Sequence, residues 1–222
     1  MASTRRLTRE ERKAHTRARL MRSAAKVAAQ RGLERASLDE VAEEAGFTKG
    51  AVYANFASKE ALFLAMLDAR FAERLEELDA ILSTEQDPDT QAREAAAAFI
   101  AAIESEPEWE RLFFEFTIYA ARNEGFRREL VERHRMLRAR VAELLERRAR
   151  RLGMEPQVPP EQVATMTFAM ANGIALERLL EPEAVPDGLY PEMMAIFFNG
   201  LRARAGTAQG PTGAPPPRAR RS

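Results

Sequence analysis

Apolar residues along this chain recur every three or four positions, which is the spacing of one face of a helix. Stretches that alternate apolar and polar residues, as a half-buried strand does, are missing from the sequence. Ala, Leu, Glu and Arg fill the periodic stretches, and Gly, Pro and Ser lie between them. The pattern predicts an all-α fold of about nine helices, over approximately 13–31, 38–45, 48–55, 59–83, a segment that starts at Pro88, 107–122, 125–153, 160–181 and 189–205.

The second and third of these helices are short and lie close together. Ser37 and Glu40 have the spacing of a capping box, in which each side chain bonds a backbone amide of the other residue. Gly46 is a typical helix end, and Thr48 can cap the helix that follows. A helix, a tight turn and a second short helix are the parts of a helix-turn-helix, whose second helix enters the major groove of DNA.

Charge is unevenly distributed, although the whole chain has 34 basic and 34 acidic residues. Residues 1–60 contain 13 Lys and Arg against 8 Asp and Glu, and residues 1–22 contain 8 against 2. A neutral body with one basic end is typical of a protein that meets DNA or a membrane surface. The uneven charge distribution alone is explained equally well by a basic terminus that is exposed to solvent and binds nothing.

Several classes of site are disfavoured by what the sequence lacks. Without cysteine there are no disulfides and no thiolate zinc sites, and His15 and His134 do not have metal-ligand spacing. No apolar run approaches the roughly 20 residues of a membrane span, and the N-terminus has no signal-peptide stretch. No set of acid, base and nucleophile converges. We therefore expect a cytoplasmic protein that is not an enzyme, has no cofactor and does not bind a membrane.

One segment is similar to the signature of the tetracycline-repressor (TetR) family. It reads Ser37-x-x-x-Val41-Ala42-x-x-Ala45-Gly46-Phe47-Thr48-x-Gly50-x-x-Tyr53-x-Asn55-Phe56-x-x-Lys59-x-x-Leu62. The resemblance implies a dimer that binds a palindromic operator in double-stranded DNA and is released by a small molecule. Together with composition, it divides the chain into a flexible basic arm (1–12), a helix-turn-helix domain (13–58), a ligand-binding and dimerisation domain (59–205) and a disordered tail (206–222).

The candidate DNA-binding residues lie in or beside the predicted helix-turn-helix. They are Ser37, Thr48, Lys49, Gly50, Ala51, Tyr53, Asn55 and Lys59. Ser37 and Thr48 are helix caps first, and their hydroxyls and neighbouring amides can also face phosphates. The resemblance implies that Lys49, Ala51 and Asn55 read bases, with Lys49 donating to guanine and Ala51 touching a thymine methyl. Asn55 has phosphate contact as an alternative.

Three of these residues have a second interpretation. Gly50 costs a helix about 1 kcal/mol relative to Ala, which is explained by close approach to DNA or by a tight helix contact. Tyr53 can donate to a phosphate or be a half-buried core residue, and both can hold at once. The charge of Lys59 opposes the dipole at the start of its helix, so it fits a phosphate contact, and a solvated lysine is the alternative. The arginines of the arm can reach phosphates or form a charged tail.

The segment 107–122 is unusually aromatic, and the resemblance implies an inducer pocket in this part of the chain. The candidate ligand-binding residues are Trp109, Phe113, Phe116, Tyr119, Met166, Met170 and Asn172. Such a lining suits an apolar or aromatic ligand. The alternative for each residue is ordinary core packing.

The last two predicted helices are the candidate homodimer interface, as the resemblance implies. Small residues allow helices to approach closely, and they recur at Ala164, Ala169, Ala171, Gly173 and Ala175. The final helix has a broad apolar side, with Met193, Met194, Ile196, Phe197 and Leu201. The helix at 59–83 leads from the DNA-binding end into the body, so we expect it to transmit the ligand signal. The competing hypothesis is a DNA-binding adaptor or architectural protein without an inducer.

Overall fold

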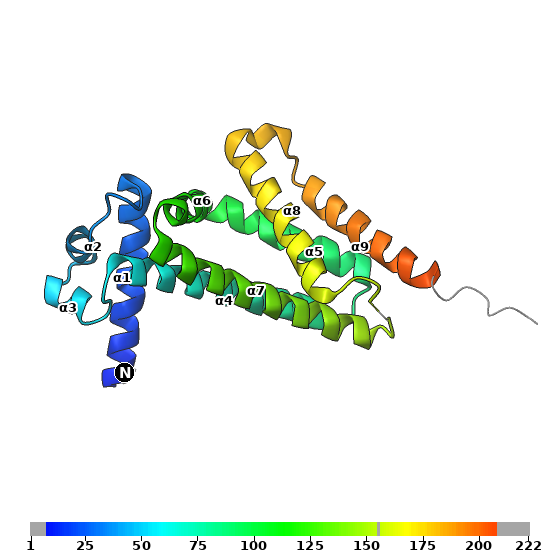
Figure 1. Cartoon of the computed structure of the whole chain (residues 1–222), viewed down its shortest axis with the longest axis horizontal. Coiled ribbons are helices and arrows are strands. Elements are labelled where there is room, and N and C mark those ends of the chain that lie inside the picture. Colours follow the sequence, from blue (N-terminus) through cyan, green and yellow to red (C-terminus); the bar gives the residue numbers. More distant parts are fainter. Residues whose placement is uncertain (1–7, 155, 208–222) are drawn as a thin grey trace, which may run out of the picture.

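The computed structural model describes residues 8–154 and 156–207, which form nine α-helices and one short 3-10 helix, with no strand. The α-helices are α1 (Arg9–Arg31), α2 (Leu38–Ala45), α3 (Lys49–Tyr53), α4 (Lys59–Ser83), α5 (Pro88–Ser105), α6 (Pro107–Arg122), α7 (Glu124–Arg151), α8 (Pro160–Leu180) and α9 (Leu189–Thr207). The 3-10 helix η1 (Pro182–Ala184) lies between α8 and α9. Figure 1 shows a head of α1–α3 at one end of an elongated body made by α4–α9. The predicted all-α architecture is confirmed.

Local end signals account for the helix boundaries in the head. The Ser37 Oγ accepts from the Glu40 amide at 3.3 Å, and the Glu40 carboxylate accepts from the Ser37 amide at 3.0 Å, which completes the predicted capping box. Gly46 ends α2 with a φ of +67°, a left-handed conformation that glycine adopts without a Cβ penalty. Thr48 caps α3 by accepting from the Ala51 amide at 3.2 Å.

The first helix begins earlier than the sequence pattern suggested, so the loose arm expected over 1–12 is wrong for residues 9–12. Thr8 caps α1, since its hydroxyl accepts from the Glu11 amide at 3.1 Å. The Glu11 carboxylate in turn accepts from the Thr8 amide at 2.7 Å. This second capping box adds a turn to α1. The rest of the arm and residues 208–222 of the expected tail lie outside the described residues.

The core of the head continues into the body through α6. Phe116 of α6 is 1% exposed and lies among aromatic rings of the body. Its ring centroid lies 6.2 Å from that of Phe63 on α4, 6.3 Å from Trp109 and 6.1 Å from Phe126 on α7. Buried residues of α1 and α2 belong to the same cluster. The head therefore has no separate hydrophobic core.

Two further clusters hold the body together. One joins α5, α8 and α9, and the other joins α4, α7 and α8. Arg178 of α8 forms ion pairs with Glu104 of α5 and, at 3.1 Å, with Asp187. Its guanidinium also donates to the Val185 carbonyl at 3.2 Å, which fastens the turn between α8 and α9.

His134 of α7 lies between two aromatic side chains. Its ring stacks on Phe113 at 5.8 Å and meets Phe71 edge-on at 5.7 Å. Burial, and then the positive charge of Arg138, lower its pKa below the usual 6.5. The imidazole is therefore neutral at physiological pH.

Phe116→Ala should lower the free energy of unfolding by about 3–5 kcal/mol, because it removes a fully buried ring and leaves a cavity. Ile118→Ala on the same helix is the matched control, since Ile118 is 56% exposed. The control should change stability by less than about 0.5 kcal/mol. Denaturant unfolding measures both, and equal effects of the two variants would contradict a fused core.

Stability should fall as the pH drops below about 6.5, because the unfolded chain then protonates His134 more readily than the folded protein does. His134→Phe should remove this part of the pH dependence. His15→Gln is the control, because His15 is exposed and is the other histidine of the chain. Melting temperatures between pH 5 and 8 test the prediction, and an unchanged profile for His134→Phe would overturn it.

Candidate DNA-binding surface and ligand cavity

The turn between α2 and α3 is tight and leaves one face of α3 exposed. The Phe47 amide donates to the Ala42 carbonyl at 2.9 Å, which folds the chain back across the end of α2. Val52 and Phe56, exposed by 0% and 3%, bury the inner face. The structure places four of the predicted residues together on the outer side, namely Thr48, Lys49, Gly50 and Tyr53.

The surroundings of Gly50 and Tyr53 argue against the core-packing alternative for each, while their contact with DNA stays a prediction. A Cβ built on Gly50 meets nothing closer than the Thr48 Oγ1 at 3.9 Å among the described residues. A tight helix contact within the chain therefore does not explain this glycine. Tyr53 is 57% exposed, so it is not a half-buried core residue.

Three other predicted residues already have partners within the head. The Lys49 ammonium pairs with Asp39 of α2 at 2.6 Å, and this hydrogen bond and the charge of Asp39 raise the pKa of Lys49. Asn55 donates to the Ala51 carbonyl at 2.7 Å, and both residues are half-buried. Base reading by Lys49, Ala51 and Asn55 stays a prediction, and Lys49 must exchange Asp39 for a base to do so.

Lys59 has a structural role that the sequence did not indicate. Its ammonium donates to the Glu34 carbonyl at 2.7 Å and lies 3.4 Å from the carbonyl oxygens of Leu33 and Ala36. The charge therefore fastens the loop between α1 and α2 to the start of α4. The predicted phosphate contact remains untested, and it requires the same ammonium to serve both the loop and the DNA.

Two arginines of α1 also hold the head together, and the sequence analysis missed both. Arg17 donates to the Asn55 carbonyl at 3.0 Å and lies 4.2 Å above the Phe56 ring. Arg19 donates to the Ala45 carbonyl at 2.9 Å and lies 4.8 Å above the Phe47 ring. A guanidinium over an aromatic face is a stabilising arrangement, so these contacts orient α3 relative to α1. No spacing rule along the sequence identifies such partners.

The second half of α6 contacts the head and the first turn of α4 through polar groups. Glu115 accepts from the Leu33 amide at 2.8 Å. The Tyr119 hydroxyl donates to Glu60 at 2.8 Å, and burial, followed by this hydrogen bond, raises the pKa of Tyr119 to about 12. Movement of α6 would therefore displace the loop between α1 and α2 and the first turn of α4.

A cavity of about 230 Å³ lies in the body between α4, α5, α6, α7, α8 and α9. Three of the predicted ligand residues line it: Trp109, Phe113 and Asn172. Most of the aromatic lining from the other helices was not predictable from the sequence, including Phe71, Phe99, Tyr190 and Phe198. These residues are spread over 128 positions of the chain, from 71 to 198, so only the packing of the helices brings them together.

Four predicted ligand residues do not line this central cavity. Phe116 faces the core shared with the head, and Tyr119 faces Glu60. Met166 is 41% exposed on the outer face of α8, and Met170 packs against the cluster of α5, α8 and α9. The aromatic side chains of α6 project from several faces of the helix, so some line the cavity and others lie in the core.

The charged residues that line the central cavity all belong to α4 and α6. They are Arg70, Arg74, Glu77 and Glu110. Arg70 pairs with Glu106 at 2.9 Å, and its guanidinium lies 5.7 Å from the Trp109 ring centre. Burial raises the pKa of Glu110 against the opposing effect of the two arginines. The lining from the other helices is uncharged.

Within the described ranges, no cluster of three or more metal-ligating side chains occurs. Across the same part of the chain, no helix is both long enough and apolar enough to cross a membrane.

Comparison with known proteins gives matches to both parts of the chain. Residues 20–66 match the family model described as bacterial regulatory proteins, tetR family. Residues 88–203 match the model described as BetI-type transcriptional repressor, C-terminal. An uncharacterised helix-turn-helix transcriptional regulator of Bacillus subtilis, YfiR, is 27% identical over 80% of this chain and 87% of its own length.

Solved structures of regulators share the fold. A transcriptional regulator from Rhodococcus matches with a TM-score of 0.65 and 25% identity, over 85% of this chain and 97% of that one. The regulator FadR of Bacillus subtilis, solved with stearoyl-CoA, matches with a TM-score of 0.67 and 11% identity, over 81% and 96% of the two chains. One model matches the head, and the other matches more than half of the whole chain. The protein therefore belongs to the tetR family of bacterial regulatory proteins and is a DNA-binding transcriptional regulator, not an enzyme.

Proposed function

We propose that this regulator is a cytoplasmic repressor that binds a palindromic operator as a dimer and is released by a small apolar or aromatic ligand. The observation that carries the DNA-binding part is the outer face of α3, where Gly50 is open and Tyr53 is exposed. The N-terminus of α3 and its cap Thr48 can meet phosphates on either side of the groove. Selection of bound sites from random DNA tests the proposal, and a discrete palindrome is the expected result.

In this proposal α3 lies in the major groove. Lys49 donates to a guanine, Ala51 touches a thymine methyl, and Asn55 contacts a base or a phosphate. Tyr53 and Ser37 contact the DNA backbone from the two sides of the helix-turn-helix. Lys59 reaches a phosphate only while it also holds the loop between α1 and α2, so its main contribution is to the shape of the head.

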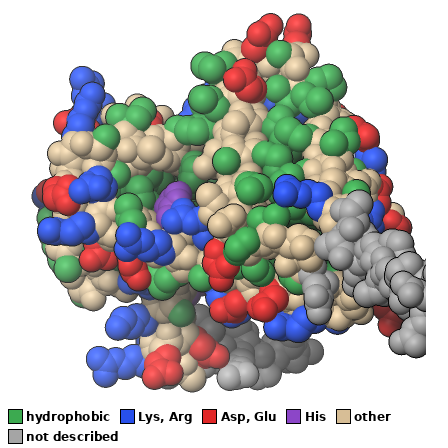
Figure 2. Space-filling model, turned by 45° about the vertical axis from the view of Figure 1, so that its right-hand side comes forward, with side chains coloured by type: hydrophobic (Ala, Val, Ile, Leu, Met, Phe, Trp, Pro, Cys, Tyr) green, Lys and Arg blue, Asp and Glu red, His purple; other side chains and the backbone are tan. Residues whose placement is uncertain are grey.

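A second copy of the chain is proposed to cover the outer faces of α8 and α9. Of the residues expected at this interface, Ala164, Ala175 and Met194 are buried inside the chain and cannot form it, whereas Ala169, Gly173 and Ile196 are exposed. Exposed apolar or small residues follow α8 at helical spacing, at Met166, Ala169, Gly173, Leu176 and Leu180. On α9 the exposed apolar residues include Leu189 and Ile196. Figure 2 shows hydrophobic side chains gathered over the part of the surface where these two helices lie. Large exposed apolar areas on a protein surface favour association, and identical faces give a two-fold dimer.

The ligand is proposed to occupy the central cavity and to act on the head through α6. The cavity meets the first half of α6 at Trp109 and Phe113. The second half of α6 bonds to Leu33 in the head and to Glu60 in the first turn of α4. A ligand shifts the protein toward a DNA-incompetent state only if it binds that state more tightly. A ten-fold loss of operator affinity needs about 1.4 kcal/mol of coupling. The structural neighbour FadR was solved with stearoyl-CoA, so this fold can accommodate a ligand that has a long apolar part.

Gly50→Ala should weaken operator binding by about ten-fold or more, because the added methyl group stands between α3 and the DNA. The same change should leave the fold intact or stabilise it by about 0.4–1 kcal/mol, since a Cβ there is unhindered. Gly125→Ala is the matched control: Gly125 is an exposed helical glycine of α7 with nothing within 4 Å of an added Cβ. Fluorescence anisotropy with labelled operator measures the affinities, and equal binding by both variants would remove Gly50 from the interface.

Leu176→Glu combined with Ile196→Glu should convert the dimer to a monomer, because four carboxylates would then face each other across the two-fold axis. Sedimentation of the wild type should give about twice the chain mass of 24.9 kDa. Met136→Glu is the control, since Met136 is 52% exposed but lies on α7. A wild-type monomer that still binds a palindrome tightly would refute the proposed interface.

A further inference from the structure

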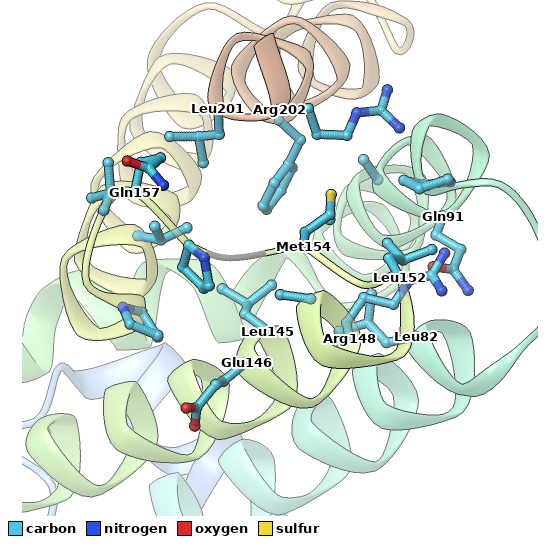
Figure 3. Close-up of a pocket in the computed structure, with 18 residues that line it drawn as sticks. Leu82, Gln91, Leu145, Glu146, Arg148, Leu152, Met154, Gln157, Leu201 and Arg202 are labelled. Atoms are coloured by element: carbon cyan, nitrogen blue, oxygen red, sulfur yellow. The ribbon is translucent and has the colours of Figure 1, made fainter. Parts of the chain in front are cut away.

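A second cavity, of about 140 Å³, lies at the end of the body away from the head. It is lined by the C-terminal ends of α4, α7 and α9, the first turns of α5 and α8, and Met154 and residues 156–158 between α7 and α8. Figure 3 shows Leu145, Leu152, Met154 and Leu201 among the side chains that surround it. Neither the DNA-binding surface nor the central cavity accounts for this space.

The two cavities lie end to end. They share four lining residues, one each from α4, α5, α7 and α9: Leu82, Ala92, Leu145 and Phe198. Along α7 the lining passes from Leu137 in the central cavity through Leu145 to Leu152 in the second one. At 1.5 Å per residue, this path along the helix is roughly 22 Å long. The cavities therefore follow the long axis of α7 and do not lie on opposite sides of the body.

The lining is mainly apolar along this path, and charged side chains lie toward its two ends. Charged residues of the central cavity are on α4 and α6, next to Trp109. All four shared residues are apolar. Beyond them, the lining also includes the polar side chains of Gln91 and Gln157 and the charged side chains of Glu146, Arg148 and Arg202. Each charged side chain pairs with a group that does not line the cavity: Glu146 with Arg150 at 3.0 Å, Arg148 with the Gln86 carbonyl at 3.0 Å, and Arg202 with Asn199. The Gln91 amide nitrogen donates to the Thr84 carbonyl at 2.9 Å. The surface that faces the second cavity is mainly apolar, so it suits apolar groups.

We propose that the two cavities form one site for an elongated amphiphile with a single unbranched hydrocarbon chain, an inference that rests on the proposed ligand-responsive function. The polar head group lies by Arg70 and Trp109, and the chain runs along α7 and past Phe198 into the second cavity. A compact aromatic ligand would fill the central cavity alone and leave the second one empty. A narrow chain needs only a rotation of the half-buried Phe198 side chain to pass between the shared residues.

The proposal predicts a ligand preference that increases with chain length. Each methylene that enters an apolar cavity contributes about 0.8 kcal/mol, which corresponds to about four-fold in affinity. The gain should continue until the chain reaches the end of the second cavity at Leu152 and Leu201.

Trp109 is the single tryptophan of the chain and lines the central cavity, so its fluorescence reports occupancy. Octanoic, dodecanoic and hexadecanoic acid are the probes, each titrated below the concentration at which it forms micelles. Affinity should rise strongly from the shortest acid to the longest.

Ala149→Phe fills only the second cavity, because Ala149 does not line the central one. It should leave octanoic acid binding within about two-fold and weaken hexadecanoic acid by about ten-fold or more. Ala171→Phe, which fills only the central cavity, is the control and should weaken both acids. Leu201→Phe narrows the second cavity from α9 and replaces Ala149→Phe if that variant melts well below the wild type.

Equal affinities for the three acids, or full retention of hexadecanoic acid binding by the variants that fill the second cavity, would overturn the inference. An unchanged Trp109 signal with every acid would overturn it as well. The selection of bound DNA sites tests the proposed function separately. If the protein binds a specific operator and a compact ligand releases it, the proposed function holds even though the inference of a two-cavity site for a hydrocarbon chain fails. If no discrete DNA site is selected, the proposed function is refuted, whatever affinities the three fatty acids show.

Discussion

The burial of Phe116 between the head and the body is the contact on which the rest of the arrangement depends. The ring is in contact with α4 and α7 in the body, and its cluster includes the buried faces of α1 and α2. Polar contacts of the same helix, from Glu115 and Tyr119, surround this apolar contact. Because α6 also lines the central cavity through Trp109 and Phe113, one rigid helix touches both the ligand site and the DNA-binding end.

Features set by neighbouring residues were predictable from the sequence. The capping box of Ser37 and Glu40, the left-handed Gly46 and the cap Thr48 each depend on fewer than five residues, and all three are present. The capping box of Thr8 and Glu11 follows the same rule and was overlooked because the surrounding residues are charged. The exposed positions of Lys49, Gly50 and Tyr53 follow from the burial of Val52 and Phe56 on the other side of α3.

Features set by packing between distant helices were not predictable in the same way. Phe113 and Phe116 are three residues apart and equally apolar, yet the first lines the cavity and the second fills the core. Only the positions of α4 and α7 decide between these environments. Lys59 looks like a free cation in the sequence, and the carbonyl groups that bind it belong to residues 33–36, more than twenty positions earlier.

The shared core also limits how regulators of this kind can be recombined. A chimera that joins this head to the body of a relative at residue 58 would separate α1 and α2 from Leu112, Phe116 and Phe126, with which they share one buried cluster. The graft would have to carry α6 and the start of α7 together with the first three helices. In a modular description of the protein, the natural unit of exchange is therefore discontinuous along the chain, even though the DNA-binding sequence motif is continuous.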